Sequence, residues 1–508
     1  MRFQGMAAVA IALAFGMVGA ADASSPKDQV RAWRQAHEKE IVGDFVTLLS
    51  KPNVATTLPD VDANAAYIQG LLEKRGFTTK LLRAQPGTPA SVFAEMKVPG
   101  AKRTVTFYAH YDGQPISQKG WISTPFEPSM RTALPEAKPV DWKGAAKLDP
   151  NWRLFARGAG DDKGSIQALI SAFDALRAAG IRPSVNIKLL YEGEEEQGSP
   201  HFAALVAQNL ETVRGDLLIM GDGPMHQSGK QEINFGNRGF AGFRAVVYGP
   251  LEPLHDGHYG SWAPSPTVMI SSLVMSLRDE DGKILIPGIY DDVQPVSASD
   301  KAALAALPDV EADLKKAMGL GRNVGGPRLA DGYMRPTLNI RAVHGGDDGP
   351  NAANAIATEA NASLDFRLVP GETPARVRQL TEAYLTRQGW FIVRDTPDLA
   401  TRRAHPKIVR INWDAGESIA TESAMDSPAA KAVAASISRT AGYPVLKLPF
   451  MGGSSGMAEI VNQLKAPMVG VAIANYDDNQ HARNENLRIG NLWDGIEVYA
   501  GLLADLDW

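Results

Sequence analysis

Short apolar runs alternate with longer segments of helical periodicity along the first half of the chain. Three runs have the length and apolar content of buried strands, at residues 104–109, 185–191 and 216–220. Three segments carry apolar residues at helical spacing, at residues 26–50, 64–75 and 165–179. Strands separated by helices favour a mostly parallel sheet covered by helices on both faces. The pattern therefore predicts an α/β domain at the start of the chain.

This rhythm changes near Gly239 and returns near Ser427. A strand over 243–248 leads into loops rich in Pro and Gly, and the first pattern resumes with a short apolar strand over 467–474. We therefore predict one domain interrupted by another. The expected parts are a signal segment over 1–23, a main α/β domain over 24–239 and 416–508, and an inserted domain over 240–415.

Cysteine is absent from the 508 residues, which excludes disulfides, thiolate metal ligands and a cysteine nucleophile. Any metal ion must therefore be held by His, Asp or Glu side chains. The net charge is −5, from 52 basic and 57 acidic residues. Nothing in this balance indicates the clustered basic surface of a nucleic-acid-binding protein.

The N-terminus has the pattern of a secretory signal. Arg2 precedes an apolar run over 6–18, and Ala21-Asp22-Ala23 offers a small-residue cleavage site. A retained membrane anchor is the alternative, but the run is short for a membrane span. We therefore expect an exported protein without a membrane span after processing, with the periplasm as the expected compartment.

Acidic and imidazole side chains stand next to the ends of predicted elements. His110-Tyr111-Asp112 follows the strand over 104–109, and residues two apart on an extended chain point the same way. The carboxylate can then orient an imidazole that binds a metal. Asp161-Asp162 precedes the helix over 165–179. Such a pair is either a helix N-cap or a carboxylate that bridges two metal ions.

An acidic run, Glu192-Gly193-Glu194-Glu195-Glu196, follows the strand over 185–191. Its like charges indicate either a solvated loop or a site for divalent cations. Asp222 and His481 follow two further strands, and each alone would be an ordinary loop residue. In an open α/β sheet, however, ligands gather outside the carboxyl ends of the strands. The combined set suits two zinc or manganese ions and leaves one glutamate as general base.

The order and spacing of these motifs resemble the M20 family of metallopeptidases, most closely its carnosinase-like dipeptidase branch. The resemblance covers nearly all of the mature chain. It implies a phosphorylase/hydrolase-like α/β catalytic domain with a mixed, mostly parallel sheet, an inserted α+β lid or dimerisation domain, and two zinc ions, with manganese in some members. It assigns the metal ligands to His110, Asp161, Glu196, Asp222 and His481.

Roles within the site follow from the same resemblance. Asp161 matches the bridging ligand, and its peptide bond to Asp162 is expected to be cis. Asp112 would orient His110, and Glu195 falls on the general base.

The resemblance also extends into the inserted part. His255 would reach the partner subunit's site and stabilise the oxyanion, with His258 as a weaker candidate. Asn354 and Arg367 match contacts to the substrate's carbonyl and carboxylate, and an arginine fork suits a carboxylate. A surface strand residue is the alternative reading of Arg367.

Gly453 and Ser454 resemble a loop that binds the substrate terminus through backbone N–H groups and a hydroxyl. Departures from the family's pattern concern substrate preference and are found at Gly160, Ser261, Ser265, Ala357 and Gly456. The segment over 279–334 is longer than a compact lid requires and is expected to reshape the pocket or the dimer contact.

We therefore expect a homodimeric two-metal hydrolase that cleaves amide bonds in dipeptides or short peptides. An N-acyl-amino-acid deacylase or a carboxypeptidase on the same site is the alternative within enzymes. A peptide-binding protein without activity would be expected to lack a ligand or the base, and the sequence retains them all. Metal storage is the remaining class.

Overall fold

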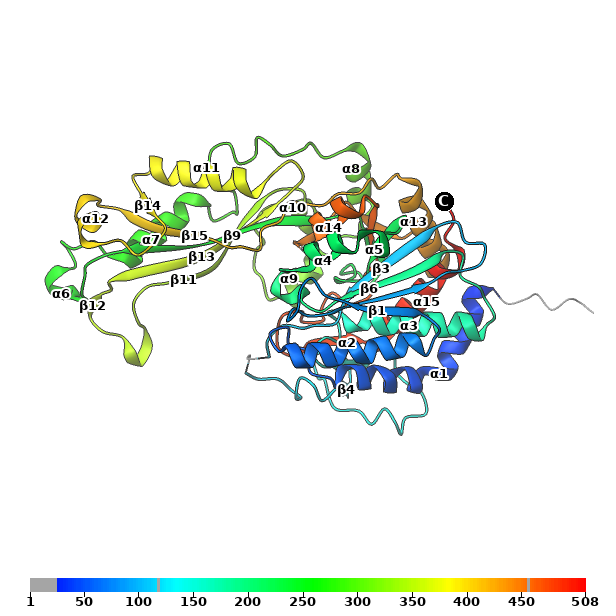
Figure 1. The fold of residues 1–508 in the computed structure, drawn as a ribbon. Coiled ribbons are helices and arrows are strands. Elements are labelled where there is room, and N and C mark those ends of the chain that lie inside the picture. The colour runs from blue at the N-terminus through cyan, green and yellow to red at the C-terminus, as the bar shows by residue number, and fades with distance from the viewer. Residues whose placement is uncertain (1–24, 117–118, 455–456) are drawn as a thin grey trace, which may run out of the picture.

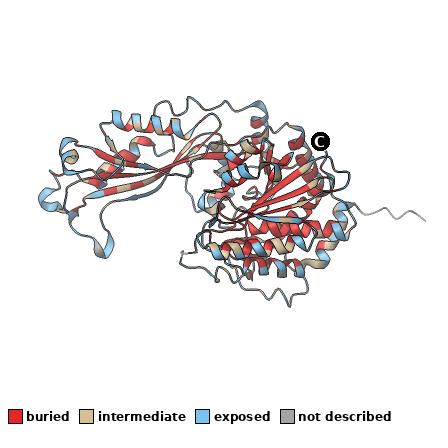
Figure 2. Ribbon diagram, viewed as in Figure 1, coloured by how far each residue is buried: buried red, intermediate tan, exposed pale blue. Residues whose placement is uncertain are grey.

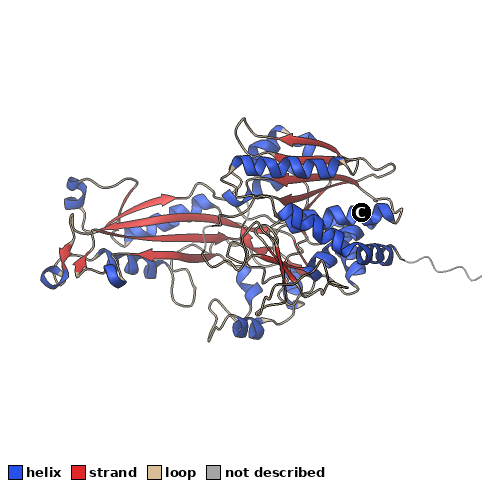
Figure 3. Cartoon of the chain, turned by 90° about the horizontal axis from the view of Figure 1, so that it is seen from below, coloured by secondary structure: helices blue, strands red, loops and turns tan. Residues whose placement is uncertain are grey.

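The computed structural model describes residues 25–116, 119–454 and 457–508. The predicted signal segment over 1–23 lies outside the described residues. The chain forms two β-sheets that extend away from one another, so the molecule is elongated (Figures 1 and 3). Among the residues that the structure describes, no helix combines the length and apolar character that a membrane span needs.

The first sheet has eight strands in the order β1-β2-β6-β3-β7-β18-β8-β16. Their bounds are β1 (Thr78–Leu82), β2 (Ser91–Met96), β3 (Thr104–His110), β6 (Asn186–Glu192), β7 (Leu217–Met220), β8 (Glu232–Asn234), β16 (Leu446–Leu448) and β18 (Met468–Gly470). The central strands β6, β3, β7 and β18 are parallel. Antiparallel pairs occur between β1 and β2, between β2 and β6, and between β18 and β8. The expected α/β class with a mixed, mostly parallel sheet is confirmed.

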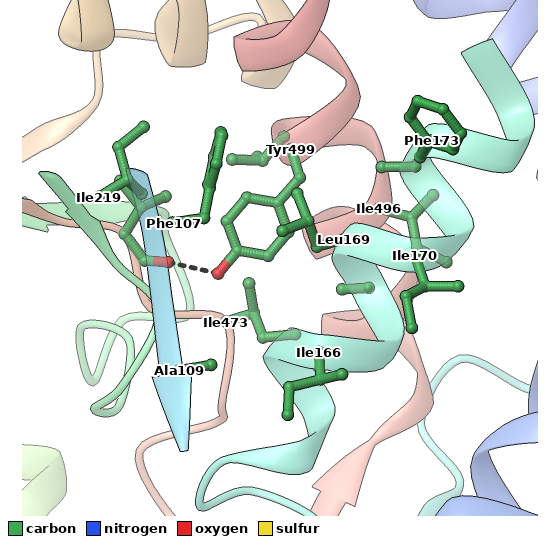
Figure 4. Close-up of a cluster of buried hydrophobic side chains, with 14 of the residues drawn as sticks. Phe107, Ala109, Ile166, Leu169, Ile170, Phe173, Ile219, Ile473, Ile496 and Tyr499 are labelled. Atoms are coloured by element: carbon green, nitrogen blue, oxygen red, sulfur yellow. Dashed lines mark hydrogen bonds between the residues drawn. The ribbon is translucent and has the colours of Figure 1, made fainter. Parts of the chain in front are cut away.

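Helices cover both faces of this sheet. One face carries α1 (Pro26–Leu49), α2 (Leu58–Glu73), α3 (Lys163–Ala178), α13 (Pro428–Ala441) and α15 (Ile489–Asp505). The other carries α4 (Phe202–Gln208), α5 (Leu210–Val213) and α14 (Met457–Leu464). Alternation along β3 sends Phe107 and Ala109 to the first core and Tyr108 to the second. Figure 4 shows Phe107 beside Tyr499 of α15, with Leu169 of α3 next to the Tyr499 ring, and Figure 2 shows that the strands of this sheet are mostly buried.

The second sheet takes its main strands from residues 237–413, the stretch for which the sequence predicts an inserted domain. In the order β11-β13-β9-β15-β14, they are β11 (Thr337–His344), β13 (Glu359–Leu368), β9 (Asn237–Tyr248), β15 (Ile408–Trp413) and β14 (Phe391–Val393). The helices α7 (Pro266–Leu277) and α11 (Pro374–Arg387) pack on it around a core of their own. We call this part the lid. A strand from the end of the chain, β17 (Met451–Ser454), also pairs with β9 and so joins the two parts.

Smaller elements complete the fold. A three-stranded sheet contains β4 (Ser129–Arg131), β5 (Arg153–Phe155) and β19 (Asn486–Arg488). The remote end of the lid carries β10 (Leu254–His255), α6 (Asp256–Tyr259) and β12 (Ala355–Ile356) (Figure 1). The long lid segment between α7 and β11 contains α8 (Ala298–Ala305), α9 (Glu311–Ala317) and α10 (Leu329–Tyr333), and α8 packs against β16 of the first sheet. The helix α12 (Leu399–Ala404) lies between β14 and β15, and short 3₁₀ turns lie at Glu195–Gln197 and Gly349–Asn351.

Strand β9 begins at Asn237, six residues before the strand predicted over 243–248. The early part was missed because its glycines interrupt the apolar pattern. Gly239 is required by packing, since a Cβ there would lie 2.6 Å from the carbonyl oxygen of Ser418. The glycine therefore allows two backbones to approach closely instead of ending the strand.

Strand β18 is shorter than the prediction over 467–474, because its ladder stops at Gly470. The carbonyl oxygens that follow are bonded by side chains instead. The Tyr499 hydroxyl donates to Val471 at 2.9 Å, the Gln231 amide to Ala472 at 2.9 Å, and the Asn491 amide to Ile473 at 2.8 Å. Side-chain donors of this kind satisfy buried backbone groups without a neighbouring strand.

Candidate metal centre

The predicted ligands come from loops at one edge of the first sheet. β3 ends at His110, which lies opposite Glu192 at the end of parallel β6. Parallel β7 ends at Met220, just before Asp222. Because the carboxyl ends of parallel strands meet at the same edge, the residues that follow them are brought together. Asp161 joins from the loop before α3, and His481 from the loop between β18 and β19.

These side chains form two groups. His110, Glu195 and Asp222 make the first group, and Asp161, Glu196 and His481 make the second. Within each group, one nitrogen or oxygen atom from every residue lies within 4.8 Å of the others. The structure thus brings the five predicted ligands together, and it places the predicted base Glu195 in the first group.

Asp161 connects the two groups through its two carboxylate oxygens. Its Oδ1 lies 2.7 Å from His110 Nε2, and its Oδ2 lies 3.2 Å from His481 Nε2. His481 Nε2 is also 3.2 Å from Glu196 Oε2. Burial opposes ionisation of Asp161, but hydrogen bonds from the two histidines outweigh it and hold the pKa of this carboxyl well below its usual range. The Asp161–Asp162 peptide bond is cis, as predicted.

Asp112 supports both groups from behind. Its Oδ1 lies 3.3 Å from His110 Nδ1, on the side of the ring that faces away from Asp161. Its Oδ2 accepts a hydrogen bond from the backbone N–H of Glu196 at 3.0 Å. His110 and Asp112 are fully buried. A carboxylate on the second ring nitrogen fixes the tautomer in which the first nitrogen can bind a metal.

The charge of the cluster fits divalent cations. Burial, with added repulsion from Asp161 and Glu196, raises the pKa of Asp222 to about 7. Burial, with the charges of Asp222 and Glu196, likewise raises the pKa of Glu195 well above its ordinary value. Among the described residues, Glu196 Oε1 and both oxygens of Asp162 are buried without a hydrogen-bond partner. Divalent cations would remove this repulsion and bind the unpaired oxygen of Glu196.

The glutamates of the acidic run that follows β6 have two roles. Two of them form supporting hydrogen bonds, and two belong to the metal groups. Glu192 is fully buried and accepts a hydrogen bond from the Tyr108 hydroxyl at 2.7 Å. Glu194 accepts hydrogen bonds from the backbone N–H and the ring of His201, at 2.8 and 2.9 Å. The two remaining glutamates, Glu195 and Glu196, enter the two groups. The run is therefore not a solvated loop.

Glu485 is a supporting residue that the sequence did not reveal. It is fully buried, and its Oε1 accepts hydrogen bonds from the backbone N–H groups of Gly160 and Asp161, both at 3.0 Å. Its Oε2 accepts one from Arg157 at 2.8 Å. Glu485 therefore holds the backbone that carries the connecting carboxylate. Its position four residues after His481 was the only available signal, because its partners lie more than 300 residues earlier.

Two of the predicted substrate contacts line one cavity of about 1270 Å³, namely Arg367 and Gly453. Arg367 is held by Asp365, whose Oδ2 accepts from its Nε at 3.1 Å, and it lies over the ring of Phe240. The Ser454 hydroxyl donates to the carbonyl of Gly239 at 2.9 Å. Ser455 and Gly456, which follow in the same loop, lie outside the described residues.

His255 and Asn354 are not brought to the metal groups of their own chain. They belong to the β10–β12 region at the remote end of the lid (Figure 1), where the backbone N–H of Asp256 donates to the Asn354 carbonyl at 3.1 Å. The His255 side chain is exposed and accepts a hydrogen bond from the Gly257 N–H at 3.1 Å.

Comparison with known proteins identifies relatives of this arrangement. Residues 106–505 match the model of peptidase family M20/M25/M40. The chain is 28% identical to Cys-Gly metallodipeptidase dug1 of Schizosaccharomyces pombe over 368 residues, which cover 68% of this chain and 73% of that protein. It is 27% identical to human Beta-Ala-His dipeptidase over 432 residues, covering 82% and 78%. The crystal structure of the M20 family metallo-carboxypeptidase Sso-CP2 from Sulfolobus solfataricus superposes with a TM-score of 0.76 at 26% identity, covering 92% of this chain and 99% of that one.

Replacement of Glu485 tests its supporting role. We expect Glu485→Gln to weaken zinc binding by about 10- to 100-fold, because an amide NH₂ facing Arg157 disturbs the backbone that carries Asp161. Titration calorimetry of the metal-stripped protein measures the affinity, and circular dichroism checks the fold. Glu459→Gln, on the exposed side of α14, is the control. Equal zinc affinity in the two variants would exclude the supporting role.

Proposed function

We propose that this chain, which belongs to peptidase family M20/M25/M40 and is a metallopeptidase, hydrolyses dipeptides. In this proposal Glu195 is the general base. The connection of two ligand groups by the Asp161 carboxylate carries this proposal. Bound divalent ions would lower the pKa of a shared water and polarise the scissile carbonyl. The imidazole and carboxylate ligands, without thiolate, suit zinc or manganese.

Glu195 supplies the proton transfer in this proposal. Its carboxylate lies in the first group, within 4.8 Å of ligand atoms of His110 and Asp222. From there it takes a proton from the attacking water and delivers it to the leaving amine. Glu196, its neighbour, faces His481 and holds the second group together. Two adjacent glutamates thus have different roles because they point to different groups.

Replacement of Glu195 separates a base from a ligand. We expect Glu195→Gln to retain both metal ions and to lose about 10²- to 10⁴-fold in kcat, since the amide cannot accept the proton. Elemental analysis gives the metal content, and dipeptide hydrolysis gives kcat. Glu211→Gln, whose side chain is 86% exposed, should behave as wild type. A Glu195→Gln protein with full kcat would refute the role of base, and one that lost a metal ion would make Glu195 a ligand.

The proposed substrate class is dipeptides and short peptides. Two of the relatives are named as dipeptidases, which supports this choice. Sso-CP2 is named as a carboxypeptidase, so removal of a C-terminal residue from longer peptides is the second candidate. N-acyl amino acids also contain an amide bond next to a carboxylate, and they are the third candidate substrate class. A product analysis with all three substrate classes, on protein reconstituted with zinc or manganese, distinguishes them.

We also propose a homodimer in which His255 and Asn354 act on the partner subunit's site. Both lie at the remote end of the lid, away from the metal groups of their own chain (Figure 1). Nearby apolar side chains face outward: Trp262 is 82% exposed, and Val268 and Met275 of α7 are 63% and 50% exposed. Exposed apolar side chains close to one another support a protein interface in this region. His255 would then donate to the oxyanion that develops on the substrate carbonyl.

Mixing two inactive variants tests this arrangement. Refolded mixtures of Glu195→Gln and His255→Ala subunits should recover about a quarter of wild-type activity, because half of the dimers are mixed and each contains one intact composite site. Light scattering verifies the dimer. Mixtures of Glu195→Gln with Glu196→Gln are the control, since both changes lie in the metal groups and no site is restored. Absence of recovery in the first mixture would show that His255 does not act across subunits.

Export to the periplasm is proposed from the N-terminal pattern alone, with Ala23 as the last residue removed. N-terminal sequencing of the protein purified from its native host locates the cleavage site.

A further inference from the structure

The cavity that contains Arg367 and Gly453 is strongly cationic. It has a volume of about 1270 Å³, and most of its wall comes from the long lid segment over 278–339. Seven basic and two acidic residues line it, although the whole chain has a net charge of −5. One of the seven is Arg367, and the others are Arg238, Arg278, Lys283, Lys315, Arg328 and Arg335.

Most of the basic side chains in this wall have no ion-pair partner among the described residues. Arg367 has an ion pair with Asp365, but no ion pair involves the other six among the described residues. Of the two acids, Asp281 pairs with Arg322, which lies outside the wall, and Glu311 accepts hydrogen bonds from backbone N–H groups. A concave surface lined by one sign of charge concentrates the field and favours an anionic ligand.

The surroundings of Arg238 are a second indication that the cavity binds an anion. It is only 5% exposed, and its Nη2 donates to the carbonyl oxygens of Arg335 and Arg367 at 3.0 and 3.3 Å. Its Nε is buried without a hydrogen-bond partner, as is Nε of Arg278. Burial, together with the charge of Arg367, lowers the pKa of Arg238 to about 10. An anion in the cavity would relieve this repulsion between neighbouring guanidinium groups.

The cationic cavity adjoins a second cavity that reaches residues next to the candidate metal ligands. A second cavity of about 330 Å³ is lined by Gln480, beside the ligand His481, and by Pro224, close to the ligand Asp222. Tyr333, Gly452 and Gly453 line both cavities. A substrate whose amide bond lies at the metal groups would therefore extend past this shared wall into the cationic cavity.

We propose that the cavity is a specificity pocket for an acidic side chain, so that the preferred substrates are dipeptides with Asp or Glu after the cleaved bond. This inference rests on the proposed function. The substrate's α-carboxylate carries one charge, for which Arg367 suffices. The six other basic side chains of the wall have no ion-pair partner and can bind a second carboxylate. In a dipeptide, the side chain of the C-terminal residue is the group that can supply this carboxylate. The long lid segment then determines substrate choice, since it supplies Arg278, Lys283, Lys315, Arg328 and Arg335.

Two isosteric dipeptides test the pocket. Ala-Glu and Ala-Gln differ in one charge, and we expect kcat/KM to favour Ala-Glu by on the order of tenfold at low salt. The preference should decrease as the ionic strength rises, because salt screens partly exposed charges. Both assays use the full-length, metal-loaded protein.

Two neighbouring lysines on α9 provide a matched pair of variants. Lys315 lines the cavity, whereas Lys316 is exposed and does not. We expect Lys315→Gln to lower the Ala-Glu to Ala-Gln ratio about two- to fivefold and Lys316→Gln to leave it unchanged. Arg335→Gln, at an exposed position of the same wall, is a second variant that should act like Lys315→Gln.

The outcomes separate this inference from the function on which it rests. If Ala-Gln is cleaved as well as Ala-Glu, the specificity pocket is refuted while the peptidase activity stands. The specificity pocket is also refuted if the preference for Ala-Glu is unchanged in all three variants, Lys315→Gln, Arg335→Gln and Lys316→Gln. If the metal-loaded protein cleaves neither dipeptide, nor any other peptide, the proposed function itself fails.

Discussion

The carboxylate of Asp161 connects parts of the chain that are otherwise far apart. One oxygen faces His110 at the end of β3, and the other faces His481 near the end of the chain. Several further carboxyl groups are buried around it, an arrangement that is unfavourable unless cations balance their charge. The position of this one side chain therefore determines whether the surrounding acids form a metal centre.

The fold places Asp161 by two independent means. The parallel strands β6, β3 and β7 bring Glu192, His110 and the loop of Asp222 to one edge of the sheet. Glu485 then holds the backbone of the Asp161 loop against that edge through two N–H groups, while Arg157 balances its charge. The lid contributes a different property. Its long segment surrounds a substrate-sized cavity with positive charge, so metal binding and substrate choice are assigned to separate parts of the chain.

Much of this could be predicted from local patterns in the sequence. The strands β3, β6 and β7 are short, apolar and followed by acidic or imidazole residues, so their ends indicate where candidate ligands gather, and the family resemblance assigns the individual roles. Features that depend on distant contacts could not be predicted. Glu485 acts on backbone amides more than 300 residues earlier, and nothing around it in the sequence marks it as buried.

The same limit explains the errors in the predicted strands. The length of β9 depends on the close approach of Ser418 to Gly239, and the early end of β18 depends on three side-chain donors from elsewhere in the chain. Likewise, no local pattern could show that His255 and Asn354 lie at the remote end of the lid, since that follows from the length and direction of β9 and β13.

Anomalous diffraction from zinc-loaded crystals would locate the metal ions relative to Asp161. Two zinc peaks are expected, one on each side of the Asp161 carboxylate. The first should lie against His110 and Asp222, and the second against Glu196 and His481. A single peak, or peaks that do not contact Asp161, would show that this carboxylate does not join two metal ions.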